Sequence, residues 1–131
     1  MSKPDVLMVG PMPGYIADGL DEAFTVHRLH EAEDREAFLS GPAGKVKGVA
    51  TMGRADAALM DALPSLEIIS SFGVGYDGVD VGHAASRGIV VTNTPDVLND
   101  DVANLAITFL LTVSRRFVEW DAYVRDGRWQ K

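Results

Sequence analysis

Five short strand-like runs, most of them largely apolar and separated by segments with helical spacing, constrain the fold of this chain more than any other feature. The runs are residues 6–9, 24–29, 46–51, 66–72 and 89–94. The helical segments between them are residues 15–23, 31–39, 55–63 and 79–87. A continuous apolar run is typical of a strand buried on both faces, as in a parallel sheet. The alternation predicts a three-layer α/β domain with a five-stranded parallel sheet, in a flavodoxin-like strand order.

The C-terminal quarter has a different pattern. Apolar residues recur at helical spacing from residue 99 to residue 126, which predicts one long helix of about 42 Å at 1.5 Å per residue. A domain of this size is only about 30 Å across, so such a helix must overhang it, bend or cover something else. We therefore expect residues 1–98 to form the flavodoxin-like domain. Residues 99–131 are expected to form a long helix and hinge leading to a further domain, as in the first part of a longer protein.

Composition excludes several classes of function. The chain of 131 residues has a net charge of −7 and no basic stripe, which argues against a nucleic-acid partner. Without cysteine it has no disulfide, thiolate metal site or cysteine nucleophile. His27 and His30 would point to opposite faces of a strand, and no third ligand is evident, so no metal site is predicted. The polar N-terminus is unlike a signal peptide, no apolar run is long enough to span a membrane, and a cytoplasmic location is expected.

A glycine-rich loop follows the fourth apolar run. Its glycines have the spacing G-x-G-x-x-G: Gly73, Gly75 and Gly78. A dinucleotide-binding fingerprint also needs a helix of normal length and an acidic residue after the next strand. Asp96 could supply the acid, but residues 79–87 allow only about two helical turns. Asp77 would also place a negative charge against a pyrophosphate. This pattern disfavours the dinucleotide interpretation.

Two other interpretations of the loop remain. It could be a turn that merely connects a strand to a helix. It could instead hold a small anion, such as a carboxylate, on the backbone N–H groups of Val74 and Gly75, because glycines allow close approach and clustered N–H donors attract anions. Ligands of open parallel sheets bind beyond the carboxyl ends of the strands, where residues 73–77 are expected to lie. The anion-binding interpretation fits the sequence best.

Three segments carry a resemblance to a known family. They are residues 63–80, residues 88–103 and the Arg-x-Gly-x-Trp pattern of residues 125–129. With these segments the chain resembles the N-terminal part of the D-isomer-specific 2-hydroxyacid dehydrogenases, and most of all their glyoxylate/hydroxypyruvate reductase and hydroxyphenylpyruvate reductase branch. Before residue 63 the likeness is limited to the strand–helix pattern.

The resemblance implies a function. The family reduces small 2-oxo acids with NADH or NADPH, in an active site between a substrate domain and a Rossmann cofactor domain. It implies that the backbone amides of Val74 and Gly75 hold the substrate carboxylate. Met52 would line the pocket near the substrate side chain, and Val102 would lie against the nicotinamide. The chain departs from the family at Asn104, where an acidic residue is usual.

The family's catalytic arginine, acidic residue and histidine lie in or after the cofactor domain, so no catalytic residue is assigned to this chain. We expect the chain to be inactive alone and to bind neither NAD nor NADP tightly. The full-length parent is expected to be a homodimer, and the fragment to self-associate through its long helix. The sequence does not identify the 2-oxo acid, nor does it choose between NADH and NADPH.

The alternative is a stand-alone flavodoxin-like binding or signalling module. A flavin carrier needs N–H donors in the loop after the first strand, but residues 10–14 include two prolines, which have no N–H. A receiver domain needs an aspartate at the end of the third strand, where this chain has residues 51–53, Thr-Met-Gly. A stand-alone sensor of 2-oxo acids stays open.

Overall fold

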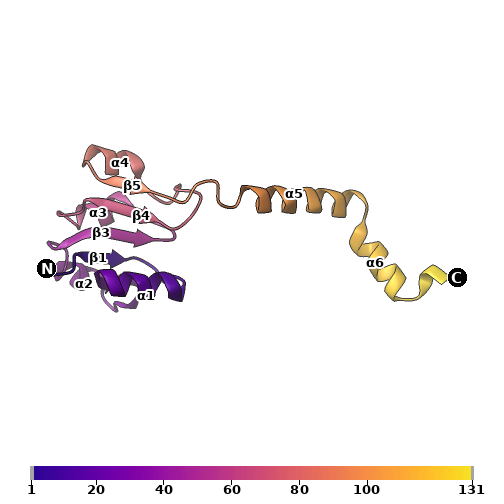
Figure 1. Ribbon diagram of the computed structural model, residues 1–131, viewed down its shortest axis with the longest axis horizontal. Coiled ribbons are helices and arrows are strands. Elements are labelled where there is room, and N and C mark those ends of the chain that lie inside the picture. The colour runs from indigo at the N-terminus through magenta and orange to yellow at the C-terminus, as the bar shows by residue number, and fades with distance from the viewer. Residues whose placement is uncertain (1, 131) are drawn as a thin grey trace. The chain divides into compact units, whose positions relative to one another are not determined.

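The computed structural model describes residues 2–130, which divide into two compact units, residues 2–95 and residues 96–130. The first unit holds a five-stranded sheet in the order β2-β1-β3-β4-β5, with every pair parallel (Figure 1). The strands are β1 (Asp5–Met8), β2 (Thr25–Arg28), β3 (Val46–Thr51), β4 (Ile68–Ser71) and β5 (Val90–Thr92). This is the flavodoxin-like order, so the predicted fold class is confirmed.

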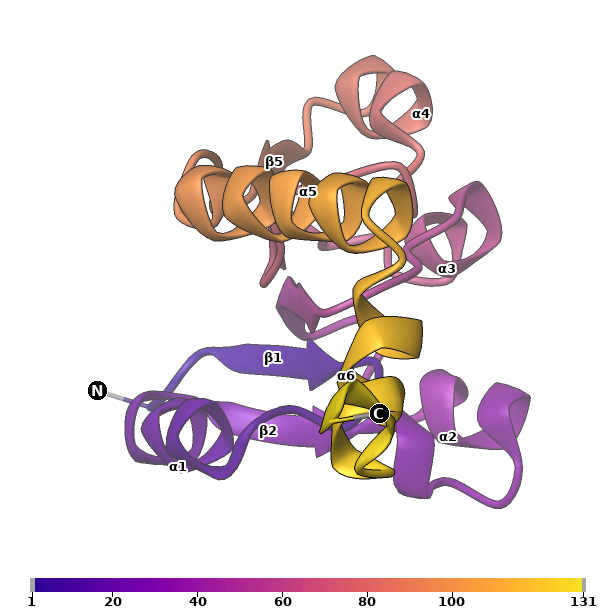
Figure 2. The same ribbon diagram turned by 90° about the vertical axis from the view of Figure 1, so that its right-hand side faces the viewer.

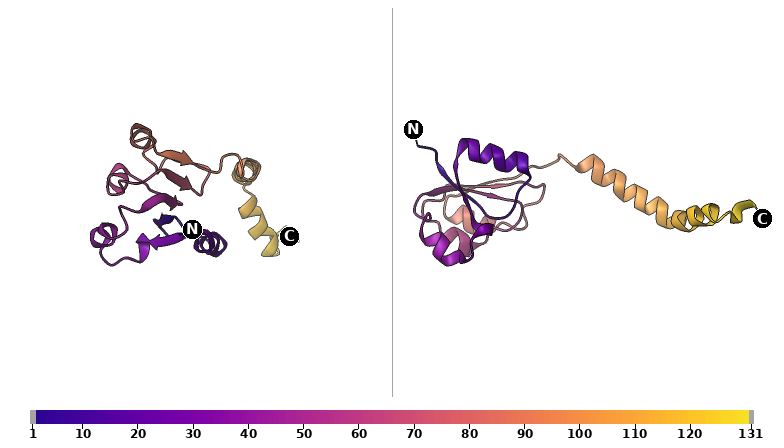
Figure 3. Two further views of the ribbon diagram at one scale, coloured as in Figure 1. Left: turned by 60° about the vertical axis from the view of Figure 1, so that its left-hand side comes forward. Right: turned by 90° about the horizontal axis from the view of Figure 1, so that it is seen from below.

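Helices lie on both faces of this sheet. The helices of the first unit are α1 (Gly14–Ala23), α2 (Arg35–Ser40), α3 (Ala57–Asp61) and α4 (Val81–Ser86), with a short 3-10 turn η1 (Leu29–Glu31). Figure 2 and the left view of Figure 3 show α2, α3 and α4 on one face, and α1 on the other. The domain therefore has the three predicted layers, and within the described residues α1 alone forms the layer on its side.

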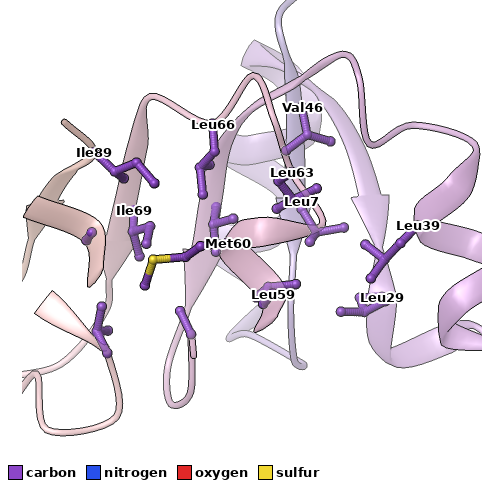
Figure 4. Close-up of a cluster of buried hydrophobic side chains, with 14 residues drawn as sticks. Leu7, Leu29, Leu39, Val46, Leu59, Met60, Leu63, Leu66, Ile69 and Ile89 are labelled. Atoms are coloured by element: carbon purple, nitrogen blue, oxygen red, sulfur yellow. The ribbon is translucent and has the colours of Figure 1, made fainter. Parts of the chain in front are cut away.

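The hydrophobic core lies between the sheet and the layer of α2, α3 and α4 (Figure 4). Leu7, Val46 and Ile69 from three neighbouring strands have no exposed surface, and Met60 and Leu63 cover them from the helical side with none either. Burying such a side chain stabilises the fold by about 1.5–3 kcal/mol. The apolar runs of the sequence thus form the core that their pattern predicts.

Aspartate side chains define where three of the helices begin. Asp34 accepts hydrogen bonds from the backbone N–H groups of Glu36 and Ala37, at 2.9 and 3.0 Å. Asp56 and Asp80 cap α3 and α4 in the same way. Such a cap contributes about 1 kcal/mol. The Asp34 cap also explains why α2 begins at Arg35, and not at residue 31 as the spacing of the sequence alone suggests.

A polar cluster joins the C-terminal end of α3 to α4. Arg87 donates hydrogen bonds to the carbonyl oxygens of Met60 and of Leu63, the latter at 3.1 Å. His83 Nε2 lies 2.8 Å from Asp61 Oδ1, so the two helices are linked at two points. Both carbonyls also accept backbone N–H groups, from Leu63 and Leu66 respectively, so the guanidinium adds a second bond to each at the end of α3. The cluster fixes α3 against α4, and the loops that precede both helices form the site described below.

The sheet face on the α1 side is open over β4 and β5. Ile68 and Val90 are paired neighbours on this face, and their side chains are 40% and 56% exposed. Ser70 and Thr92, the next pair along, are also exposed. Parallel sheets usually have both faces covered. In the described part of this chain, that cover is incomplete.

The second unit is helical, but the predicted single helix over residues 99–126 is wrong. The structure has α5 (Asn99–Ser114) and α6 (Phe117–Arg125), followed by a 3-10 turn η2 (Arg128–Gln130). Arg116 separates the helices in a left-handed conformation, with φ 52° and ψ 40°. Its carbonyl accepts the N–H groups of Glu119 and Trp120, and its guanidinium pairs with the Glu119 carboxylate, so a new helix starts there. No glycine or proline marks the break, and the apolar spacing continues through it, which is why the pattern did not reveal it.

Among residues 2–130, no helix combines the length and the apolar content needed to cross a lipid bilayer.

Two adjacent isoleucines of β4 test this description of the sheet. Ile69→Ala removes a fully buried side chain and should lower the free energy of unfolding by roughly 2–5 kcal/mol in urea denaturation followed by circular dichroism. Ile68→Ala, the matched control on the open face, should cost less than about 1 kcal/mol. Equal losses would show that the open face is covered in solution.

Candidate functional site

The candidate site lies at the carboxyl ends of β3 and β4. These strands pair in parallel, and their last residues, Thr51 and Ser71, are register partners. The loops that follow them therefore start side by side, and the Phe72 N–H donates a hydrogen bond of 2.8 Å to the Thr51 carbonyl. The surface of Thr51 is only 1% exposed, and its hydroxyl oxygen accepts a hydrogen bond of 3.0 Å from the Gly53 N–H. The first loop is thus fixed at its start by a buried side chain.

The same two loops meet again before their helices begin. Ala55 and Val79 form an isolated parallel bridge, and both are buried. The Ala55 N–H donates to the Gly78 carbonyl at 2.9 Å, and the Asp80 N–H donates to the Ala55 carbonyl at 3.1 Å. A Cβ at Gly78 would lie 2.4 Å from the Gly53 carbonyl oxygen. Glycine is required at this position because two backbones approach closely there.

In the part of the chain that the structure describes, the loop after β4 has a run of free backbone donors, which begins at Val74 and Gly75 and continues to Gly78. Within residues 2–130, the N–H groups of Val74 and Gly75 donate no hydrogen bond. The carbonyl groups of the same two peptide groups are bound. Asn93 Nδ2 donates to the Val74 oxygen at 2.7 Å, and the Thr94 N–H donates to the Gly73 oxygen at 2.9 Å. Val74 is half-buried and Gly75 is exposed. Two neighbouring N–H donors, whose own peptide groups are held through their carbonyls, can bind an anion from solvent.

The structure brings together some of the sequence-predicted site residues. Val74 and Gly75 lie in the loop after β4, and Met52 lies in the loop after the adjacent β3, with 51% of its surface exposed. Val102 lies in α5, in the second unit, and is 62% exposed. Three of the four residues therefore share one edge of the sheet. The proposed contact of Val102 with a nicotinamide stays a prediction.

The charges around the loop do not favour an anion by themselves. A Cβ at Gly75 would lie 3.2 Å from Asp77 Oδ2, so this carboxylate is close to the free donors. Asp56, Asp77 and Asp80 line the same shallow depression as Arg54. Three carboxylates against one guanidinium leave the rim negative, as the chain is overall. The binding of an anion to this loop would therefore depend on short-range hydrogen bonds, and not on attraction by the surrounding charges.

Asn93 is a site residue that the sequence analysis missed. It directly follows β5, and its amide nitrogen donates to a loop carbonyl 19 residues earlier in the chain. A signal was available in the sequence, because a polar residue at the carboxyl end of a strand beside β4 is expected to reach the same edge of the sheet. The partner of that side chain could not be deduced from spacing.

Comparison with known proteins assigns the family. The family model described as D-isomer specific 2-hydroxyacid dehydrogenase, catalytic domain, matches residues 6–125. The chain belongs to this family. It is 47% identical over 132 aligned residues to hydroxyphenylpyruvate reductase of Plectranthus scutellarioides, covering 99% of the chain and 42% of that relative. It is 42% identical to a glyoxylate/hydroxypyruvate reductase A of Arabidopsis thaliana, again covering 42% of the relative.

Solved structures of the family superpose on the chain. A 2-hydroxyacid dehydrogenase from Ketogulonicigenium vulgare matches with a TM-score of 0.88 and 45% identity, over 99% of this chain and 42% of that one. An NADPH-dependent glyoxylate/hydroxypyruvate reductase from Sinorhizobium meliloti, in complex with NADP and malonate, matches with a TM-score of 0.81 and 45% identity, over 98% and 40%. The chain thus spans about two fifths of the length of the relatives it matches.

A pair of glycine substitutions tests the contact between the two loops. Gly78→Ala forces two backbones apart and should lower the free energy of unfolding by roughly 1–3 kcal/mol, measured by urea denaturation. Gly53→Ala, with nothing within 4 Å of the added Cβ, is the control and should change it by less than about 0.5 kcal/mol. A tolerated Gly78→Ala would contradict the close approach.

Proposed function

We propose that this chain is the substrate-binding domain of an NAD(P)-dependent D-2-hydroxyacid dehydrogenase that reduces a small 2-oxo acid of the glyoxylate or hydroxypyruvate type. The observation that carries the proposal is the pair of free N–H donors at Val74 and Gly75, at the ligand-binding edge of the sheet. A 2-oxo acid carries a carboxylate that two such donors fit. The family membership and the reductases among the relatives support the same substrate class.

Each residue of the site has a distinct role in this proposal. Val74 and Gly75 hold the carboxylate and so orient the adjacent carbonyl carbon, while Met52 contacts the rest of the substrate. Val102 lies against the nicotinamide when the cofactor is bound. Residues 1–98 form the substrate domain, and residues 99–131 lead to a Rossmann domain. The solved relative that holds NADP and malonate supports a nucleotide and a small carboxylate in the same enzyme.

The proposal divides the chemistry between this chain and the rest of its parent. Reduction of a 2-oxo acid adds a hydride to the carbonyl carbon and a proton to its oxygen, and the nicotinamide supplies the hydride. This chain binds and orients the acid. The proton donor and a cation for the carboxylate come from the part of the parent that follows residue 131. Positioning by backbone donors contributes to the rate by holding the reacting atoms in place.

The substrate-binding role predicts weak but localised binding. Oxamate, a non-reactive 2-oxo acid analogue, should bind this chain in the millimolar range, because the negative rim opposes an anion. In an amide NMR titration the largest shifts should fall within residues 73–77, at Val74 and Gly75 above all. Pyruvamide, which is uncharged, is the matched control and should leave these amides unchanged. Shifts centred on residues 10–14, or a response to NADPH alone, would contradict the assignment of the site.

The second unit supports a further proposal about assembly. Taken by itself, it buries none of its large apolar side chains. More than half of the surface of each of these residues is exposed: Val97, Val102, Leu105, Ile107, Phe109, Leu110, Leu111, Val113, Phe117, Val118, Trp120, Val124 and Trp129. Exposed apolar surface of this kind marks an association site. The chain should self-associate through α5 and α6, and the full-length parent should be a homodimer. The cytoplasmic location expected from the sequence stays a prediction.

Light scattering tests the self-association. At high concentration the chain should have the mass of a dimer or larger species, and Phe109→Glu in α5 should shift it towards monomer by placing a charge in the apolar surface. Val81→Glu, at an exposed valine of α4 in the first unit, is the control and should leave the mass unchanged. A monomeric wild-type chain at high concentration would exclude this mode of assembly.

A further inference from the structure

Two of the free donors of the loop, the N–H groups of Val74 and Gly75, belong to peptide groups whose carbonyls are held by residues 93 and 94, at the end of β5. Because a peptide group is planar and trans, its N–H points opposite to its C=O. The Val74 carbonyl and the Gly75 N–H form one such group, and Asn93 Nδ2 donates to that carbonyl at 2.7 Å. The hydrogen bond therefore directs the Gly75 N–H away from the Asn93 side chain.

The preceding peptide group is held in the same way by the backbone. The Gly73 carbonyl accepts the Thr94 N–H at 2.9 Å, which directs the Val74 N–H away from the same segment. Residues 93 and 94 are adjacent, so the N–H groups of Val74 and Gly75 are both directed away from the end of β5. Two N–H groups aimed in one direction match the two oxygens of a carboxylate, or share one of them.

The identity of the Asn93 donor follows from its partner. The Val74 oxygen can only accept, so the amide nitrogen of Asn93 must face it. Asn93 is half-buried, in a groove with mostly apolar lining: Tyr76, Val81, Ala85, Ile89 and Val91. The hydrogen bond is partly buried, and such a bond is electrostatically stronger than one in bulk solvent. Glycine at position 75 gives the peptide group freedom to rotate, so its orientation depends on this bond.

We propose that Asn93 is a positioning residue, whose side-chain amide fixes the peptide group between Val74 and Gly75 so that the Gly75 N–H faces the substrate carboxylate. The proposal rests on the function proposed above. Asn93 itself does not touch the substrate. Its contribution is to remove the alternative orientation of the peptide group, in which the carbonyl oxygen would face the anion and repel it.

The wild-type chain tests the orientation without a ligand. A scalar coupling through the hydrogen bond, between the Asn93 Nδ2 nitrogen and the Val74 carbonyl carbon, should be detectable by NMR. Asn93→Ala should move the amide signals of Val74 and Gly75 in the ligand-free chain, while the signals of α1 stay in place. Absence of the coupling in the wild-type chain would overturn the proposal, and this measurement needs no variant to fold.

Oxamate binding tests the consequence for the carboxylate. Asn93→Ala should raise the dissociation constant about tenfold, the loss expected when one charge-assisted hydrogen bond is misdirected. Asn93→Asp should raise it further, because a carboxylate cannot donate to the Val74 carbonyl and attracts the Gly75 N–H towards itself. Thr92→Asp, which adds the same charge at an exposed position one residue earlier, is the control and should change binding less than threefold.

The outcomes separate this proposal from the proposed function. Unchanged affinity in Asn93→Ala, with unchanged Gly75 signals, would show that Asn93 has no positioning role. Equal losses in Asn93→Asp and Thr92→Asp, together with wild-type affinity in Asn93→Ala, would show a charge effect alone. If the wild-type chain shows the coupling but binds no oxamate, the proposed carboxylate site is wrong, while the orientation of the peptide group by Asn93 stands.

Discussion

Parallel pairing of β3, β4 and β5 is the constraint on which the candidate site depends. The register places Thr51 beside Ser71, and Ser70 beside Thr92, so the three following loops leave the sheet at one edge. Backbone hydrogen bonds then continue the pairing beyond the strands, from the Phe72 N–H to Thr51 at the end of β3 and from the Thr94 N–H to Gly73 in the loop after β4. The central loop, after β4, is bound on both sides, to Ala55 of the loop after β3 and to Thr94 of the loop after β5. The free donors of the central loop are therefore held by the sheet itself.

The two faces of the sheet have different roles in this arrangement. The face towards α2, α3 and α4 carries the core, and the Arg87 cluster fixes α3 against α4 on that side. These two helices begin where the site loops end, so core packing and loop geometry are coupled through the caps Asp56 and Asp80. The other face is open over β4 and β5. The site can thus be well ordered in a chain whose sheet is covered only in part.

In the proposed function, the substrate domain would bind the acid through its backbone. The loop offers N–H donors but is surrounded by more carboxylates than guanidinium groups, so it would recognise a carboxylate by shape and hydrogen bonding rather than by charge. The cationic contribution and the proton donor are left to the other domain of the proposed enzyme. With the binding groups divided in this way, the substrate would be held for reaction only when the two domains close on each other. Closure of the domains would also exclude water from the site of hydride transfer.

The sequence by itself determined the strands, most of the helices that separate them and the loop of Val74 and Gly75, because these follow from local periodicity and glycine spacing. The strand order was predicted only from the fold class that the alternation suggests, and the structure confirmed it. It did not reveal the break at Arg116, since apolar spacing continues through a residue that adopts a left-handed conformation without glycine. Only the tertiary structure showed the approach of Gly78 to another backbone and the bond from Asn93 to Val74. Both join segments that are far apart in the chain and meet only once the parallel strands have paired, so no local pattern encodes them.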